Sequence, residues 1–271
     1  MVLIMQGKPV AEKIKAGLQK KFQGKNLQLA ILLVGNDEAS HVYANRLAKT
    51  AKNLDVATQK VELPFTATQQ DVEAALEKLN ADPAVQGILP MMPLPIHLNA
   101  QKLCQKLVPE KDMDCLNPLN AGGVFLGTNP WAPCTPRACL AILDYYHIDL
   151  AGKNVVVLGR SNVVGKPVAM LLLQKNATVT ICHSKTQNLP AILRQADIIV
   201  AAIGRAEFVE PSMVKEGVVI VDVGINARGD KLVGDVAATV AGKAAAFTPV
   251  PGGVGVVSNV MVMEALSRCI K

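Results

Sequence analysis

Short runs of Val, Ile and Leu alternate along the chain with longer segments in which apolar residues recur at helical spacing. The runs predict buried strands, and the longer segments predict amphipathic helices. Alternation of the two is typical of a parallel sheet covered by helices. In the first half of the chain the pattern predicts helices over about residues 8–22, 38–54 and 69–80, and strands over 27–34, 56–63 and 85–89. Thr68 and Asp71 form a capping signal for the third helix, because a hydroxyl can accept from an otherwise unpaired N–H.

The second half of the chain shows the same alternation. The pattern predicts helices over about 137–146, 165–174, 188–195 and 259–270, and strands over 154–159, 178–182, 198–203 and 218–223. The first of these strands is an unbroken apolar run, typical of a strand that is covered on both faces. Strand and helix alternate through this part in the order of a βαβαβ unit.

Residues 90–136 separate the two halves and are rich in Pro, Gly and Asn, which interrupt regular structure. A long irregular stretch inside a compact domain is unusual unless it is functional. We therefore expect these residues to line a cleft between two lobes, and the fold class to be α/β.

The composition narrows the possible partners. The 271 residues are 50% hydrophobic, 18% charged and 3% aromatic, with a formal net charge of +6. This excludes a mostly disordered chain, and no apolar run approaches the roughly 20 residues of a membrane span. The mild charge and few aromatics argue against nucleic acid. The six cysteines form no Cys-x-x-Cys pair, and the N-terminus lacks a signal-peptide pattern. We expect inert thiols, no metal site and a cytoplasmic protein.

A strand, a tight turn and a helix in succession predict a nucleotide site at Val155–Pro167. Glycine permits such a turn, and it lets backbone N–H groups approach a pyrophosphate at the helix N-terminus. The spacing departs from G-x-G-x-x-G: Gly159 holds the first position, Ser161 the second, and Gly165 lies one residue late. The alternative interpretation is an ordinary glycine-rich turn between a strand and a helix.

The charge at the end of the second strand of this unit favours NADP over NAD. A ribose 2′-hydroxyl is bound by an Asp or Glu there, whereas a 2′-phosphate needs cations and hydroxyls. The chain has Ser184 and Lys185 at this position and no acid, and Arg160 in the first turn can reach the same corner. The alternative is a plain solvated loop.

Several segments carry a resemblance to a known family. In chain order they are Val34-Gly35, Ala39-Ser40 with Tyr43, Met92-Pro-Leu-Pro-Ile-His97, Pro109-Glu-Lys-Asp-Met-Asp114, Pro133-Cys-Thr-Pro136, Gly159-Arg-Ser161, Gly165-Lys-Pro167, Val221-Asp-Val-Gly224-Ile-Asn226, Gly234-Asp-Val236 and Thr248-Pro-Val-Pro-Gly-Gly-Val-Gly255. In this order and spacing, nearly end to end, the chain resembles the bifunctional methylenetetrahydrofolate dehydrogenase/cyclohydrolase (FolD) family.

The resemblance implies a two-lobed homodimer of one-carbon metabolism with NADP as cofactor. It places a folate-binding catalytic domain in 1–136, with the C-terminal helix 257–271 packing back on it, and a Rossmann-type NADP-binding domain in 137–256. It implies oxidation of 5,10-methylenetetrahydrofolate, followed by hydrolysis of the methenyl product to 10-formyltetrahydrofolate.

The family's pattern also assigns site residues. The NADP-binding set is Gly159, Arg160, Ser161, Gly165, Ser184 and Ile225, and the folate-binding set is Tyr43, Pro93, Asp114, Pro251, Gly252 and Gly253. Tyr43 and Asp114 are the implied catalytic residues. Tyr43 would line the folate ring, and Asp114 would accept hydrogen bonds from the amino face of the pterin.

Departures from the family's pattern gather on the folate side. Leu47 stands at the position of a family lysine, four residues after the tyrosine, and Met91 at the position of a family glutamine. Arg46, three residues after Tyr43, is a possible substitute cation, but an arginine stays protonated and so cannot shuttle a proton. Further departures are Cys115-Leu-Asn117 and Val256-Val257-Ser258.

These departures predict that the dehydrogenase step is retained at least in part and that the hydrolysis step is weak or absent. Two alternatives remain open. One is a degenerate paralogue that binds NADP but has lost or changed its folate activity. The other is a different NADP-dependent dehydrogenase with the same lobe plan, such as the shikimate type.

Overall fold

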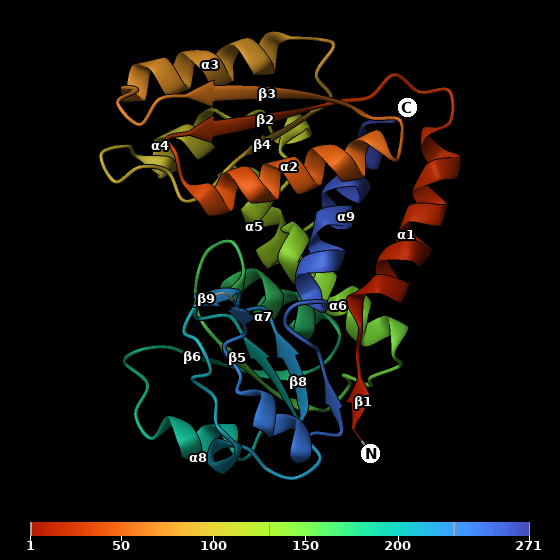
Figure 1. Ribbon diagram of the computed structural model, residues 1–271, viewed down its shortest axis with the longest axis vertical. Coiled ribbons are helices and arrows are strands. Elements are labelled where there is room, and N and C mark those ends of the chain that lie inside the picture. Colours follow the sequence, from red (N-terminus) through yellow and green to blue (C-terminus); the bar gives the residue numbers. More distant parts are fainter. Residues whose placement is uncertain (1, 130, 230, 271) are drawn as a thin grey trace. The chain divides into compact units, whose positions relative to one another are not determined.

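The computed structural model describes residues 2–129, 131–229 and 231–270. The chain divides into two compact units, each built on its own sheet. Of the described residues, the three-stranded unit contains 13–129, 131–134 and 259–270, and the six-stranded unit contains 2–12, 135–229 and 231–258. Figure 1 shows the alternation of strands and helices in both. The predicted α/β class is confirmed, and the expected cleft stays a prediction.

The sheet of the three-stranded unit is parallel, in the order β3-β2-β4. The central strand β2 (Gln28–Val34) pairs with β3 (Ala57–Leu63) and β4 (Gly87–Pro90). Because a central parallel strand is covered on both faces, its sequence is almost wholly apolar. The helices α3 (Gln69–Ala81) and α4 (Ala100–Lys106) pack on one face, and α2 (Glu38–Lys52) lies on the other (Figure 1).

The capping signal predicted for α3 is present as a reciprocal pair of hydrogen bonds. The Asp71 N–H donates to Thr68 Oγ1 at 3.2 Å, and the Thr68 N–H donates to Asp71 Oδ2 at 2.9 Å. Each bond satisfies a donor that the first turn of a helix leaves unpaired.

The stretch 90–136 is more regular than the sequence predicted. It contains α4, the 3-10 turn η1 (Pro109–Lys111), α5 (Pro118–Leu126) and the start of α6 (Cys134–Tyr145). Proline stands at the first position of α5, where its missing N–H costs nothing, and Asn117 caps that helix by accepting from the Leu119 N–H at 2.7 Å. The prolines therefore begin helices here instead of excluding them.

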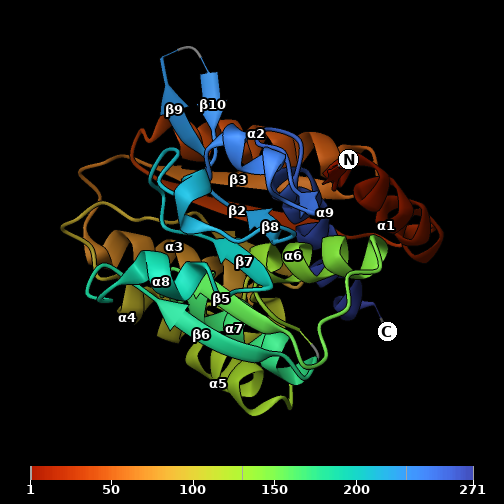
Figure 2. The same cartoon turned by 90° about the horizontal axis from the view of Figure 1, so that it is seen from below.

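The six-stranded unit carries the sheet β1-β11-β8-β7-β5-β6, in which every pair is parallel. Its strands are β5 (Asn154–Leu158), β6 (Thr178–Cys182), β7 (Ile198–Ala201), β8 (Val219–Asp222), β11 (Ala246–Phe247) and β1 (Leu3–Ile4). The helices α7 (Gly165–Gln174) and α8 (Leu189–Leu193) lie on either side of β5 (Figure 2). The 3-10 turns η2 (Pro211–Met213) and η3 (Ala238–Gly242) add to the layer on the α8 side.

The pairing of the first residues differs from the sequence expectation, which placed 1–136 in one domain. β1 pairs with β11, and the Gly7 N–H at the start of α1 (Gly7–Phe22) donates to Gly252 O at 2.8 Å. A Cβ on Gly7 would lie 2.2 Å from Gly253 O, so only glycine fits this contact. These contacts hold the N-terminus to the six-stranded unit.

Other short elements were also absent from the prediction. The hairpin of β9 (Asn226–Arg228) and β10 (Lys231–Val233) projects from the six-stranded unit (Figure 2). The last helix α9 (Val254–Leu266) begins five residues before its predicted start and is followed by η4 (Ser267–Cys269). From residue 259 on, α9 belongs to the three-stranded unit, and so does η4, in which Arg268 Nη2 donates to Asp112 O.

Candidate active site

The turn between β5 and α7 has the backbone geometry of a phosphate-binding turn. Gly159 has φ +130°, and a Cβ there would lie 2.2 Å from Ala202 O. A Cβ on Gly165 would lie 2.3 Å from Gly159 O. Both positions therefore require glycine, the second because the helix begins directly against the strand end. The late position of Gly165 in the sequence pattern still gives this close packing.

Ser161 has a role in this turn that the sequence did not reveal. Its Oγ accepts from the Val164 N–H at 3.0 Å and from the Gly165 N–H at 3.3 Å. Val164, the residue before the helix, provides no side-chain cap of its own. Ser161 therefore caps α7 and fixes the turn, and its predicted contact with NADP stays a prediction. Arg160 beside it is exposed.

A tight turn follows β6 at the position that selects between NADP and NAD. The His183 N–H donates to Thr186 Oγ1 at 2.9 Å, and the Lys185 N–H donates to His183 Nδ1 at 3.1 Å. These bonds close the turn and leave Ser184 and Lys185 exposed at its tip. A hydroxyl and an ammonium on an exposed tip without a carboxylate fit a 2′-phosphate.

The remaining predicted residues of the six-stranded unit lie on loops near the carboxyl ends of its strands. Ile225 is 61% exposed, and a Cβ on Gly255 would lie 3.4 Å from Ile225 Cδ1. Gly252 has φ +110°, and a Cβ on Gly253 would lie 2.6 Å from Pro249 O. Pro251 is exposed and follows a cis peptide bond. In open α/β sheets this edge is where ligands bind.

The side chains of α2 around Tyr43 differ in their exposure to solvent. Leu47 is fully buried, whereas Tyr43 is half-buried and Arg46 is exposed. Met91 follows β4, its N–H donates to Leu32 O at 2.8 Å, and its side chain is buried. The positions of the family lysine and glutamine are thus both occupied by buried apolar side chains. The role of Arg46 as a substitute cation stays a prediction.

Asp114 is held by its neighbours in a defined place. Its Oδ1 accepts from the Cys134 N–H at 2.6 Å, and its own N–H donates to Asp112 Oδ1 at 3.2 Å. Asp112 is fully buried and also accepts from the N–H groups of Leu116 and Asn117 at 3.0 and 2.9 Å. No sequence pattern marks Asp112, which shapes the loop that presents the predicted folate-binding carboxylate. Pro93, on another loop, is exposed.

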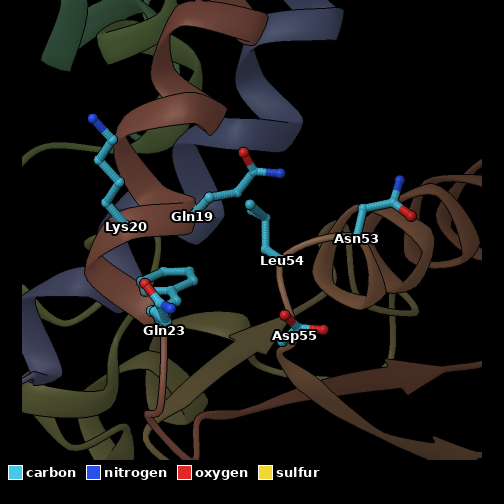
Figure 3. Close-up of a pocket in the computed structure, with 7 residues that line it drawn as sticks. Gln19, Lys20, Gln23, Asn53, Leu54 and Asp55 are labelled. Carbon is cyan, nitrogen blue, oxygen red and sulfur yellow. The ribbon is translucent and has the colours of Figure 1, made fainter.

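A hollow of about 370 Å³ lies between the end of α1 and the turn after α2 (Figure 3). The hollow is lined mainly by Gln19, Lys20, Gln23, Asn53, Leu54 and Asp55. None of the predicted site residues lines it. In the described parts of the chain no group of three His, Cys, Asp or Glu side chains is placed to hold a metal ion. No described helix is both long and apolar enough to cross a membrane.

Comparison with known proteins covers both units. A family model described as the catalytic domain of tetrahydrofolate dehydrogenase/cyclohydrolase matches residues 5–114, and the NAD(P)-binding domain of the same family matches residues 133–271. The chain is similar to the bifunctional protein FolD of Ruminiclostridium cellulolyticum, with 44% identity over 98% of this chain and 96% of that protein.

Solved structures agree with this match. The bifunctional FolD of Campylobacter jejuni has a TM-score of 0.96 and 38% identity over 100% of this chain and 99% of its own. The FolD of Trypanosoma brucei, solved with NADP and an inhibitor, has a TM-score of 0.94 and 35% identity over 99% and 97%. The chain therefore belongs to the tetrahydrofolate dehydrogenase/cyclohydrolase family.

Proposed function

We propose that this protein oxidises 5,10-methylenetetrahydrofolate to 5,10-methenyltetrahydrofolate with NADP, and that its hydrolysis of the methenyl product is weak or absent. The proposal depends on one observation: the nucleotide turn is intact, whereas fully buried Leu47 stands at the position of the family lysine. Membership of the family supports the folate substrate and the cofactor.

The six-stranded unit has the residues that would hold NADP, which accepts a hydride when bound. Gly159 and Gly165 let the turn and the start of the helix pack closely, since a Cβ on either would meet backbone atoms. A turn of this kind would present backbone N–H groups to a pyrophosphate. Ser161 fixes the turn, Ile225 borders the same edge, and Arg160 and Ser184 would take the 2′-phosphate. Hydride loss from the methylene carbon is driven by a nitrogen lone pair and removes no proton. The protein's main task in this step is to position the carbon.

On the folate side, Tyr43 would orient the ring and Asp114 would accept from the pterin. Asp112 supports this task, because it accepts the N–H of Asp114 and fixes the loop. Pro93, Pro251, Gly252 and Gly253 are the remaining proposed folate contacts. These residues bind and orient the substrate and leave its charge change to the folate nitrogens.

Hydrolysis needs more than positioning. Water attacks the methenyl carbon, and a ring nitrogen must receive a proton, so a placed acid/base group is required. Leu47 cannot titrate and Met91 cannot donate a hydrogen bond. Arg46 is exposed, and an arginine side chain supplies charge without acting as a proton shuttle. This asymmetry supports the loss of the second step alone.

A second function is favoured by the same two substitutions. With both family residues replaced by buried apolar ones, the protein would be a paralogue that binds NADP but takes a different substrate or none. Titration calorimetry with tetrahydrofolate separates the two, because the paralogue would show no folate binding.

The direct test is an assay with 5,10-methylenetetrahydrofolate and NADP, following NADPH and the methenyl product by their separate absorbances. We expect NADPH to form and the methenyl compound to accumulate in equal amount. Formation of NADPH with conversion to 10-formyltetrahydrofolate at an enzymatic rate would contradict the loss of hydrolysis. No NADPH at all would contradict the dehydrogenase.

The cofactor preference is tested by a charge at the tip after β6. Ser184→Asp is expected to raise the KM for NADP by roughly tenfold or more, since a carboxylate repels the 2′-phosphate. Gln187→Asp adds the same charge just outside the turn and is the matched control, with a KM within about twofold of the wild type. Equal KM values for the two variants would place the 2′-phosphate elsewhere.

We further propose a cytoplasmic homodimer, in which the edge strand β6 pairs with the same strand of a second copy. Most of the side chains of β6 are exposed, and an edge strand presents backbone donors and acceptors to another chain. Sedimentation of the purified protein as a monomer would contradict the dimer.

A further inference from the structure

Two buried carboxylates, of Asp222 and Asp235, have no part in the proposed reaction. Asp222 is the last residue of β8, and Asp235 lies just after β10. Their exposed fractions are 1% and 0%. Buried carboxylates are costly unless they are hydrogen-bonded, so their partners indicate what they stabilise.

Each carboxylate accepts three backbone N–H groups from loops. Asp222 Oδ1 accepts from Gly224 at 2.9 Å and from Asp235 at 3.0 Å, and its Oδ2 accepts from Val236 at 2.9 Å. Asp235 Oδ2 accepts from Ile203 at 2.6 Å and from Gly204 at 3.0 Å, while its Oδ1 accepts from Arg205 at 2.8 Å. A carboxylate accepts at both oxygens, whereas an amide would turn a donor toward some of these N–H groups.

The two aspartates and two glycines fit each other reciprocally. A Cβ on Gly234 would lie 1.8 Å from Asp222 Oδ2, and a Cβ on Gly224 would lie 2.3 Å from Asp235 Oδ1. The Asp222 carboxylate therefore fills the space beside Gly234, and the Asp235 carboxylate fills the space beside Gly224. This explains why Asp-Val-Gly and Gly-Asp occur together although they are separated in the sequence.

The loops held by this pair leave the carboxyl ends of neighbouring strands. Residues 203–205 follow β7, and residues 223–226 follow β8 and include exposed Ile225. The Asp222 N–H also donates to Thr248 Oγ1 at 2.7 Å, but this bond is made by the backbone, so a change of the Asp222 side chain leaves it in place. Because ligands bind at this edge in open α/β sheets, the conformations of these loops decide what the edge can bind.

Burying two carboxyl groups close together is unfavourable, because both desolvation and their mutual repulsion oppose ionisation. Burial raises the pKa of Asp222 to about 6, and the nearby Asp235 contributes to the rise while the three N–H groups oppose it. An apolar side chain at either position would leave three N–H groups without their acceptor, which is itself costly. The two carboxylates together therefore order three loops.

We infer that Asp222 and Asp235 are positioning residues for the cofactor: buried and without contact to it, they hold the loops at residues 203–205, 223–226 and 234–236 in the conformation that binds the nicotinamide dinucleotide. The inference rests on the proposed NADP-dependent function.

The test compares NADP binding by Asp222→Asn and Asp235→Asn with that of Asp197→Asn. Asp197 is the matched control: it accepts from the Asn154 N–H at 2.8 Å and from Lys215 Nζ at 2.6 Å, at the opposite, amino edge of the same sheet. By calorimetry we expect NADP affinity to fall by roughly tenfold or more in the first two variants and to change less than about twofold in the control. The KM for the folate should stay within about twofold in all three, which separates loop positioning from general loss of stability.

The outcomes are distinguishable. Wild-type protein that does not bind NADP would overturn the proposed function. Wild-type protein that binds NADP, with folded Asp222→Asn and Asp235→Asn variants that bind it equally well, would overturn this inference alone. Should circular dichroism show these variants unfolded, Asn226→Ala removes a single donor to Asp235 Oδ1, 3.0 Å away. We expect roughly threefold weaker NADP binding there, and unchanged affinity would overturn the inference.

Discussion

The double variant Leu47→Lys, Met91→Gln is expected to hydrolyse 5,10-methenyltetrahydrofolate about 100-fold faster than the wild type or more. A positioned acid/base group contributes typically 10²–10⁴-fold, and the wild type has no titratable side chain at either position. The dehydrogenase rate should change less than about threefold, because hydride transfer removes no proton. Loss of methenyl absorbance in a stopped assay, corrected for the buffer rate, measures the gain.

The surroundings of Leu47 support a working amine at this position. Leu47 is fully buried on α2, so a lysine there loses much of its hydration. Desolvation lowers the pKa of a lysine toward neutrality, which is where an acid/base group is most effective. The glutamine at 91 restores the side-chain amide of the family pattern. Burying an amine should also lower the free energy of unfolding by about 2–4 kcal/mol, measurable in urea.

The matched control is Leu47→Met with Met91→Gln, which keeps a side chain of similar volume at 47 without a nitrogen. We expect no gain in hydrolysis from it. Equal rates for the two double variants would mean that a missing amine does not limit the reaction. In that case the degenerate paralogue, with an altered folate lobe, would be the better description of the protein.

Local pattern was sufficient for the elements that contribute most to each core. The apolar run of β2 and the alternation from β5 to β7 place strands and helices within a few residues of where they lie. These patterns are local: an apolar run that indicates burial on both faces, and a pair of residues that caps a first turn, each lie within a few consecutive positions. The turn between β5 and α7 was likewise predicted from consecutive residues alone.

Tertiary contacts decide what the sequence did not predict. β1 and β11 have only two residues each and acquire strand character through their pairing with neighbours distant in sequence. Asp112 and Lys111 look like a charged surface pair. Instead Asp112 is buried among backbone donors, and Lys111 Nζ donates to Asn80 O at 2.8 Å, near the end of α3. A single sequence does not reveal such partners.

Gly159→Ala is expected to abolish measurable NADP binding, with a loss of at least about 100-fold in affinity. The added Cβ would lie 2.2 Å from Ala202 O, and φ of +130° is a conformation that residues with a side chain rarely adopt. Relief requires the turn to move away from β7, and this displaces the N–H groups that would bind the pyrophosphate. Calorimetry with NADP measures the loss, and urea unfolding should show a cost of about 2–4 kcal/mol.

The matched control for Gly159→Ala is Gly242→Ala, in η3 of the same unit. A Cβ there meets no atom within 4 Å, so both NADP affinity and unfolding should stay close to the wild type. A folded Gly159→Ala variant that still binds NADP would show that the dinucleotide does not lie on this turn. Since the 2′-phosphate contacts, the loops around Asp222 and the hydride step all presuppose that location, they would have to be reassigned together.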